Sequence, residues 1–179
     1  MPTFKAAPKA VADLAREILI QYDTHKPLLD ARVKLDFVFA YADENEAGLP
    51  RNFAITHHGR RVFGQARVIK LKDRVMGRGD AEITLDANWW DAATEPQQRA
   101  LLDHELHHVM VKTDKHGRFE FDDIHRPAIG MRPHDYEFGW FTVIAARHGA
   151  DSVEQEQAAR MMTTSGQFYW PGIAAKSKG

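Results

Sequence analysis

The sequence predicts a single α+β domain in which a small mixed β-sheet packs against helices. Three observations predict this class. Several windows repeat apolar residues at helical spacing, shorter windows between them alternate apolar and polar residues, and the windows follow the order helix, strands, helix, long loop, helix. The length of 179 residues suits one domain over 1–179, with its core at about 8–165 and a frayed tail at 174–179.

Composition narrows the class of protein. The chain carries 24 Lys and Arg against 25 Asp and Glu, so its overall charge favours no particular partner. It has no cysteine, no signal-peptide pattern and no apolar run long enough to span a membrane, so we expect a cytoplasmic protein without a membrane partner. Without cysteine, a metal ion would be held by His, Asp or Glu, which favours a catalytic site over a closed structural one.

The elements of the first half follow from periodicity and from breakers. A helix is expected over 8–22, where apolar residues share one face, and Lys26-Pro27 is expected to end it. Strands are expected over 33–41, 61–71 with Gly64 as a candidate bulge, and 81–85. A polar loop over 43–52 and a glycine-bearing turn over 74–80 separate them.

The second half is expected to be helical around one long loop. A helix is predicted over about 95–112, because Thr94 and Gln97 fit a capping box with Pro96 in the first turn. Its apolar stripe includes Leu102 and Leu106. An irregular segment over 113–133 follows, and then helices over about 134–147 and 152–162.

The helix over 95–112 contains the motif His-Glu-x-x-His at 104–108. His104 and His108 are one turn apart and point the same way, opposite the apolar stripe, so both can bind one metal ion. Glu105 lies on the adjoining flank, where its carboxylate can take a proton from a water that the ion activates. This pattern is typical of a zinc peptidase, although such sites also bind other divalent metals.

A catalytic zinc normally takes three protein ligands, and the third must come from elsewhere. The segment His134-Asp135-Tyr136-Glu137-Phe138 is the richest source. His134 is the first candidate, because Pro133 and a helix start would hold it by its backbone. Glu137 is the second candidate for the third ligand, although it could instead cap the start of the helix. Asp135 is the third candidate, although its charge could instead interact with the helix dipole.

Other residues are candidates for the surrounding cleft. His107 lies beside the ligands on the helix and can line the cleft or bind a second partner. Tyr136 or His58 could stabilise an oxyanion. Five histidines in loops or at helix ends are expected to be solvated or capping residues: His57, His58, His116, His125 and His148. The strand over 81–86 is expected either as an edge that binds an extended peptide or as an internal strand.

These residues resemble a known family. The run Ala100–Val109, the segment His134–Phe138 and the helix ending Arg147-His148-Gly149 are similar to the phage metallopeptidase family, as are Ala66-Arg67-Val68, Ile83-Thr84-Leu85 and Trp90. The resemblance covers about 33–149 and implies a zincin-like fold and a zinc peptidase. A looser similarity to SprT-like zinc proteases implies His134 as third ligand, although a long insert separates His108 from it here.

Two other functions stay open at this point. One is a zinc amidohydrolase acting on a non-peptide substrate, because the same metal and glutamate chemistry serves both. The other is a DNA-associated protein with a weak or relict protease site. The stretch 60–78 holds seven basic residues against the single acid Asp73 and could bind nucleic acid, or simply form a solvated edge strand.

Overall fold

The computed structural model describes residues 1–44, 53–57, 59–135 and 139–164. The helices are α1 (Lys9–Gln21), α2 (Lys26–Asp30), α3 (Leu71–Val75), α4 (Ala87–Ala92), α5 (Glu95–His108), α6 (Thr142–His148) and α7 (Val153–Thr164), with 3-10 turns at Asp23–His25 and Gly149–Asp151. The strands are β1 (Thr3–Ala6), β2 (Leu35–Tyr41), β3 (Thr56–His57), β4 (Arg60–Arg61), β5 (Gly64–Val68), β6 (Ala81–Asp86), β7 (Val109–Val111) and β8 (Ile129–Met131). The predicted α+β class is confirmed.

The main sheet has four strands in the order β1-β2-β6-β5. Strands β2 and β6 are parallel, with Phe37 opposite Ile83, whereas β1 and β5 run antiparallel to their neighbours. The sheet is therefore mixed, as expected. Small antiparallel pairs, β3 with β4 and β7 with β8, lie beside it.

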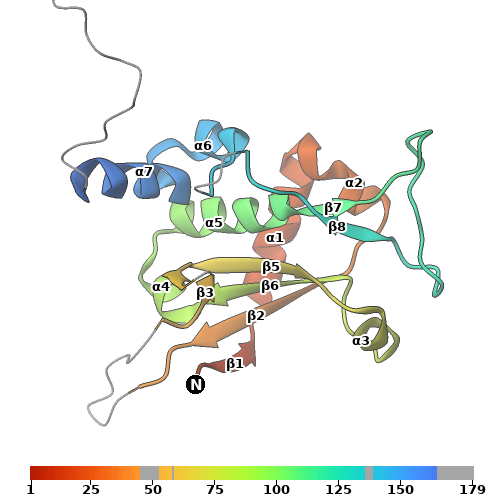
Figure 1. Ribbon diagram of the computed structural model, residues 1–179, viewed down its shortest axis with the longest axis horizontal. Coiled ribbons are helices and arrows are strands. Elements are labelled where there is room, and N and C mark those ends of the chain that lie inside the picture. Colours follow the sequence, from red (N-terminus) through yellow and green to blue (C-terminus); the bar gives the residue numbers. More distant parts are fainter. Residues whose placement is uncertain (45–52, 58, 136–138, 165–179) are drawn as a thin grey trace, which may run out of the picture.

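The core lies between this sheet and the helices α1 and α5. Val11 and Ile18 of α1 pack with Ile83 and Leu85 of β6, and Leu106 of α5 joins them. Figure 1 shows α5 running between the sheet on one side and α6 and α7 on the other. Because α5 is covered from both sides, every residue from Ala100 to His107 is buried.

Strand β5, and not β6, forms the edge of the sheet nearest α5. The expectation that 81–86 could be an edge strand is wrong, because β6 pairs on both sides and all of its residues are buried. Gly64 is not a bulge either, since it pairs in register with Leu85. The strand predicted over 61–71 is observed only as Gly64–Val68, because Leu71 already begins α3.

Three predicted helix boundaries also differ. Lys26-Pro27 does not simply end α1 but begins α2, because proline suits the first helical turn. Helix α5 ends at His108, since the β-branched Val109 and Val111 pair with β8 instead. The helix expected from 134 begins only at Thr142, as Gly139 takes a left-handed conformation with φ of 84°.

The segment between α5 and α6 is more regular than expected. After β7, Thr113 bridges to Phe119 and Phe121 bridges to Pro127, and the chain then returns through β8. The buried Arg74 side chain forms an ion pair with Asp122 in the turn of this segment, with 2.8 Å between Arg74 Nη1 and Asp122 Oδ2. None of the helices among the described residues has the length and apolar character that a membrane-spanning segment needs.

Candidate metal centre

Helix α5 holds two histidines on one side, one turn apart. Its start is the predicted capping box, in which the Thr94 hydroxyl accepts from the Gln97 amide while the Gln97 side chain accepts from the Thr94 amide. The C-terminal half of the helix is fixed by the core around it. The ring centres of His104 and His108 consequently lie 5.1 Å apart.

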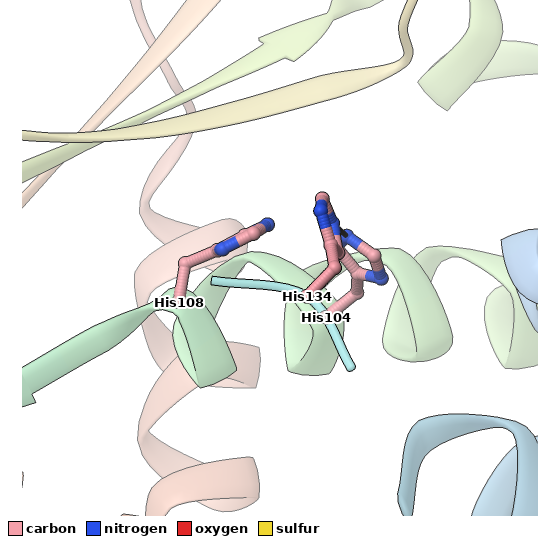
Figure 2. Close-up of side chains that lie close together, drawn as sticks. All are labelled: His104, His108 and His134. Carbon is pink, nitrogen blue, oxygen red and sulfur yellow. Dashed lines mark hydrogen bonds between the residues drawn. The ribbon is translucent and has the colours of Figure 1, made fainter. Parts of the chain in front are cut away.

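His134 reaches the same place from the segment after β8. The Arg132 amide donates to the His108 carbonyl at 2.6 Å, which brings this segment across the end of α5. The Nε2 atoms of His134 and His104 are then 3.2 Å apart. One ring nitrogen from each of the three histidines lies within 4.8 Å of the other two. Figure 2 shows the three rings gathered beside α5.

The outer nitrogens of two rings already have partners in the protein. His104 Nδ1 donates to the Glu154 carboxylate at 2.6 Å, and His108 Nδ1 donates to the Arg132 carbonyl at 2.9 Å. These bonds favour the tautomer whose Nε2 is free to bind a metal. Two nitrogens ~2.0–2.1 Å from a tetrahedral zinc lie about 3.3 Å apart. The 3.2 Å between His104 and His134 fits such an ion.

The floor of the cluster is an aromatic ring. Phe141, which has no exposed surface, lies with its ring centre 5.0 Å from that of His104 and 4.8 Å from those of His108 and His134. Burial of the His108 ring is the main reason that its pKa is lowered to about 3, and burial of the His134 ring likewise lowers its pKa to about 4. The charge of the neighbouring His104 lowers both pKa values further. Both rings are therefore neutral at pH 7, as metal ligands must be.

Glu105 lies between α5 and the edge strand β5. Burial raises the pKa of its carboxyl to about 7, although the nearby His104 and a hydrogen bond from the Ala66 amide lower it. Its Oε2 atom has no hydrogen-bond partner among the described residues. A carboxylate with a pKa close to neutrality can both take and return a proton.

Glu154, at the start of α7, is the site residue that the sequence did not indicate. It is fully buried, its Oε1 accepts from His104, and its Oε2 has no partner in the described part of the chain. Burial lowers the pKa of His104, but the hydrogen bond to Glu154 and the charge of Glu105 outweigh this, so the pKa is raised. Glu154 lies 50 positions from His104 in the sequence, so no short motif could link the two residues.

Glu105 and Glu154 together leave the cluster short of positive charge. Within the ranges that the structure describes, neither carboxylate forms an ion pair with arginine or lysine. Isolated buried carboxylates are costly, and they are normally paired or bound to a metal. Two carboxylates beside three converging imidazoles therefore suit a divalent cation, by charge as well as by geometry.

The other predicted site residues that the structure describes are not among the three converging histidines. The His107 ring accepts from the Arg132 guanidinium at 2.9 Å, and its ring centre lies 4.7 Å from that of Phe141 and 5.9 Å from that of His25. The Asp135 carboxylate accepts a hydrogen bond from the amide of Thr142, the first residue of α6, at 2.8 Å. Tyr136, Glu137 and His58 lie outside the described residues.

A second polar cluster lies on the other side of α5. The buried Asp103 accepts from His25 at 2.6 Å, from His148 at 2.8 Å and from Arg147 at 2.8 Å. The expectation that His148 is a solvated or capping residue is therefore wrong. His25 was missed because it is separated from Asp103 by 78 positions and carries no motif of its own.

The basic stretch over 60–78 is mostly engaged in ion pairs. Arg61 binds Asp86, Arg67 and Arg78 bind Glu82, and the buried Arg74 binds Asp80 and Asp122. These contacts tie strands and turns together. They offset the charge of four of the seven basic residues, and nucleic-acid binding through this stretch stays a prediction.

Residues 3–164 match the family described as "Putative phage metallopeptidase". The chain belongs to this family. Membership confirms the resemblance that the motif residues indicated, and the small mixed sheet beside α5 is consistent with its zincin-like fold. A metallopeptidase family implies a metal-dependent hydrolase of peptides or proteins. No curated protein and no solved structure matches the chain. The looser similarity to SprT-like proteases stays a prediction.

Proposed function

We propose that residues 1–164 form one zinc-dependent peptidase domain, with one ion held by His104, His108 and His134. The observation that carries this proposal is the convergence of three imidazole nitrogens within 4.8 Å of one another. Two buried carboxylates lie beside them, each with one oxygen that has no hydrogen-bond partner among the described residues. A zinc ion bound there would supply a Lewis acid that polarises a carbonyl and makes water a nucleophile at neutral pH.

The protein residues divide the remaining work. Glu105 takes a proton from the attacking water and passes it to the leaving amine, because its pKa of about 7 suits both directions. Glu154 and the Arg132 carbonyl hold the rings of His104 and His108 in the orientation needed for binding. Phe141 packs beneath all three rings and keeps water from their buried side.

The edge of β5 supports a peptide as the substrate. Among the described strands, β5 pairs only with β6, so one of its edges is free beside α5. An extended peptide can add to such an edge by main-chain hydrogen bonds. A small non-peptide amide would not use this edge, and the free edge is the observation that favours a peptidase over another zinc amidohydrolase.

The test is Glu105→Gln in the zinc-loaded protein, with casein or a peptide library as the substrate. We expect zinc to remain bound at one ion per chain, while turnover falls by about a thousandfold, since a general base typically contributes ~10²–10⁴-fold. The control is Glu95→Gln, at an exposed position of the same helix. Gln98→Glu would not serve as a control, because the Gln98 side chain caps the end of α4. Full turnover in Glu105→Gln would contradict the proposal.

A further inference from the structure

The backbone of β5 alternates between its partner strand and its free edge. The Asp86 amide donates to the Phe63 carbonyl, and the Ile69 amide donates to the Asp80 carbonyl, so odd-numbered residues pair with β6. In an antiparallel pair the residues between them direct their N–H and C=O groups the other way. The main-chain groups of Gly64, Ala66 and Val68 therefore face the free edge.

Gly64 is glycine because the Glu105 side chain occupies the space that a Cβ would need. A Cβ at position 64 would lie 2.5 Å from Glu105 Oε1 and 2.8 Å from its Cδ. Its backbone needs no left-handed conformation, since its φ is not among the positive values. The requirement for glycine thus comes from this contact alone, and any other residue would displace the carboxylate.

The next outward-facing residue supplies a hydrogen bond to the same side chain. The Ala66 amide donates to the Glu105 carboxylate. One carboxylate oxygen, Oε2, is left without a partner among the described residues. Strand β5 thus positions the Glu105 carboxylate through close packing against Gly64 and one hydrogen bond from Ala66. The Oε2 atom of Glu105 stays available to accept a proton.

We propose that β5 is a positioning element for catalysis: Gly64 provides the space for the Glu105 carboxylate and the Ala66 amide anchors it. This inference rests on the proposed role of Glu105 as base. It also restricts how a peptide pairs with the edge, because the Ala66 amide is already used. The Ala66 carbonyl and the outward groups of Gly64 and Val68 remain for the substrate, on either side of the base.

The first test is Gly64→Ala in the zinc-loaded protein. We expect kcat to fall by about 100-fold, the loss that a displacement of ~1 Å can cause, while zinc affinity stays within about twofold. Gly130→Ala is the matched control, because a Cβ there would meet its nearest atom, Met110 Cγ, at 3.4 Å. Wild-type kcat in Gly64→Ala, with Glu105→Gln inactive, would overturn the inference and leave the proposed function intact.

A double-mutant cycle separates displacement of Glu105 from general strain in β5. Glu105→Asp shortens the side chain and makes room for a Cβ at position 64. We expect the two losses in kcat to overlap, so that Gly64→Ala adds less than about threefold in the Glu105→Asp background. Losses that multiply in full would show that Gly64 acts independently of Glu105, and would contradict the inference.

A third measurement does not depend on activity. The Ala66 amide faces the free edge, so its hydrogen bond to Glu105 should protect it from exchange with solvent. In Glu105→Ala, we expect amide exchange at Ala66 to accelerate about tenfold, with Gln65 and Arg67, which pair with β6, unchanged. Unchanged exchange at Ala66 would remove the anchor from the account, whatever the fate of the proposed peptidase activity.

Discussion

Asp103 and Glu105 lie two positions apart on α5, and both are buried, yet their surroundings differ in charge. Asp103 is matched by Arg147 and two histidines, which donate to both of its oxygens. Glu105 shares its side of the helix with a second carboxylate, Glu154, and with no arginine or lysine among the described ion pairs. Among the described residues, the carboxylate on one side has its cationic partners, whereas the carboxylates on the other side suit a bound cation.

This difference is the reason that we assign the Asp103 cluster to structure and propose the Glu105 cluster as the metal site. Both sides contain histidines and buried acid groups, so composition alone does not separate them. The Asp103 side joins the 3-10 turn at His25, α5 and α6 through filled hydrogen bonds. On the Glu105 side, two carboxylate oxygens have no partner in the part of the chain that the structure describes, and ring nitrogens face one another. Unsatisfied groups of this kind are kept where function requires them.

The largest expected effect is the gain in stability on binding zinc. At a free zinc concentration ~1,000 times the Kd, the free energy of unfolding should rise by about 4 kcal/mol. His104→Ala or His108→Ala should abolish this rise, whereas the exposed His116→Ala should keep it. Urea unfolding with and without zinc measures it. A rise that survives in both motif variants would break the distinction between the two sides of α5.

The next effect concerns the complete side. Asp103→Asn should lower the free energy of unfolding of the metal-free protein by about 3 kcal/mol, because it leaves Arg147 and two histidines without their buried partner. Zinc should still stabilise this variant. Asp151→Asn, an exposed acid in a 3-10 turn, serves as the control. A loss of zinc binding in Asp103→Asn with no loss of stability would reverse the roles assigned here.

A smaller effect tests whether Glu154 acts through His104. Glu154→Gln should weaken zinc binding about 10- to 100-fold, the usual cost of removing an acid that orients a ligand. Competition with a zinc-binding dye measures the change, and Asp151→Asn is again the control because it lies three residues earlier and is exposed. Equal zinc affinity in both variants would mean that Glu154 does not position the ring.

The smallest effect is a pair of opposite pH dependences in the metal-free protein. Burial raises the pKa of Asp103, but hydrogen bonds from His148, His25 and Arg147 outweigh it and lower it well below its usual range. Its contribution to stability is present above the unfolded pKa and is lost as pH falls through the folded one. Burial raises the pKa of Glu105 to about 7, so Glu105 destabilises the fold as pH rises from about 4.5 through 7.

Urea unfolding across pH 3–8 separates these two contributions. Glu105→Gln should be more stable than the wild type at pH 8, by about 2 kcal/mol at most, and equal to it at pH 4. Asp103→Asn should flatten the loss of stability below pH 4. A Glu105→Gln variant that is no more stable than the wild type at pH 8 would argue against a buried, unpaired carboxylate.

The features that could be predicted from the sequence depend on residues close together in the chain. The capping box at Thr94 and the spacing of His104 and His108 lie within one helix, so the start of α5 and its paired histidines could be read from the sequence. The strands at 35–41 and 81–86 also follow from their apolar alternation. Each of these features depends on neighbours a few positions away.

The features that escaped prediction depend on tertiary packing. Which strand forms an edge is decided by the pairing of β6 with both β2 and β5, and the sequence of β6 does not encode its neighbours. Glu154 reaches His104 only because α7 packs beside α5. The contact that excludes a side chain at Gly64 is equally non-local, so its glycine looked like a bulge.

The most direct test is a crystal structure of the zinc-loaded protein with anomalous scattering at the zinc edge. The account predicts one peak about 2.0–2.1 Å from a ring nitrogen of each of His104, His108 and His134. A peak at Asp103, His25 and His148 instead, or no peak in protein that binds zinc in solution at one ion per chain, would contradict it.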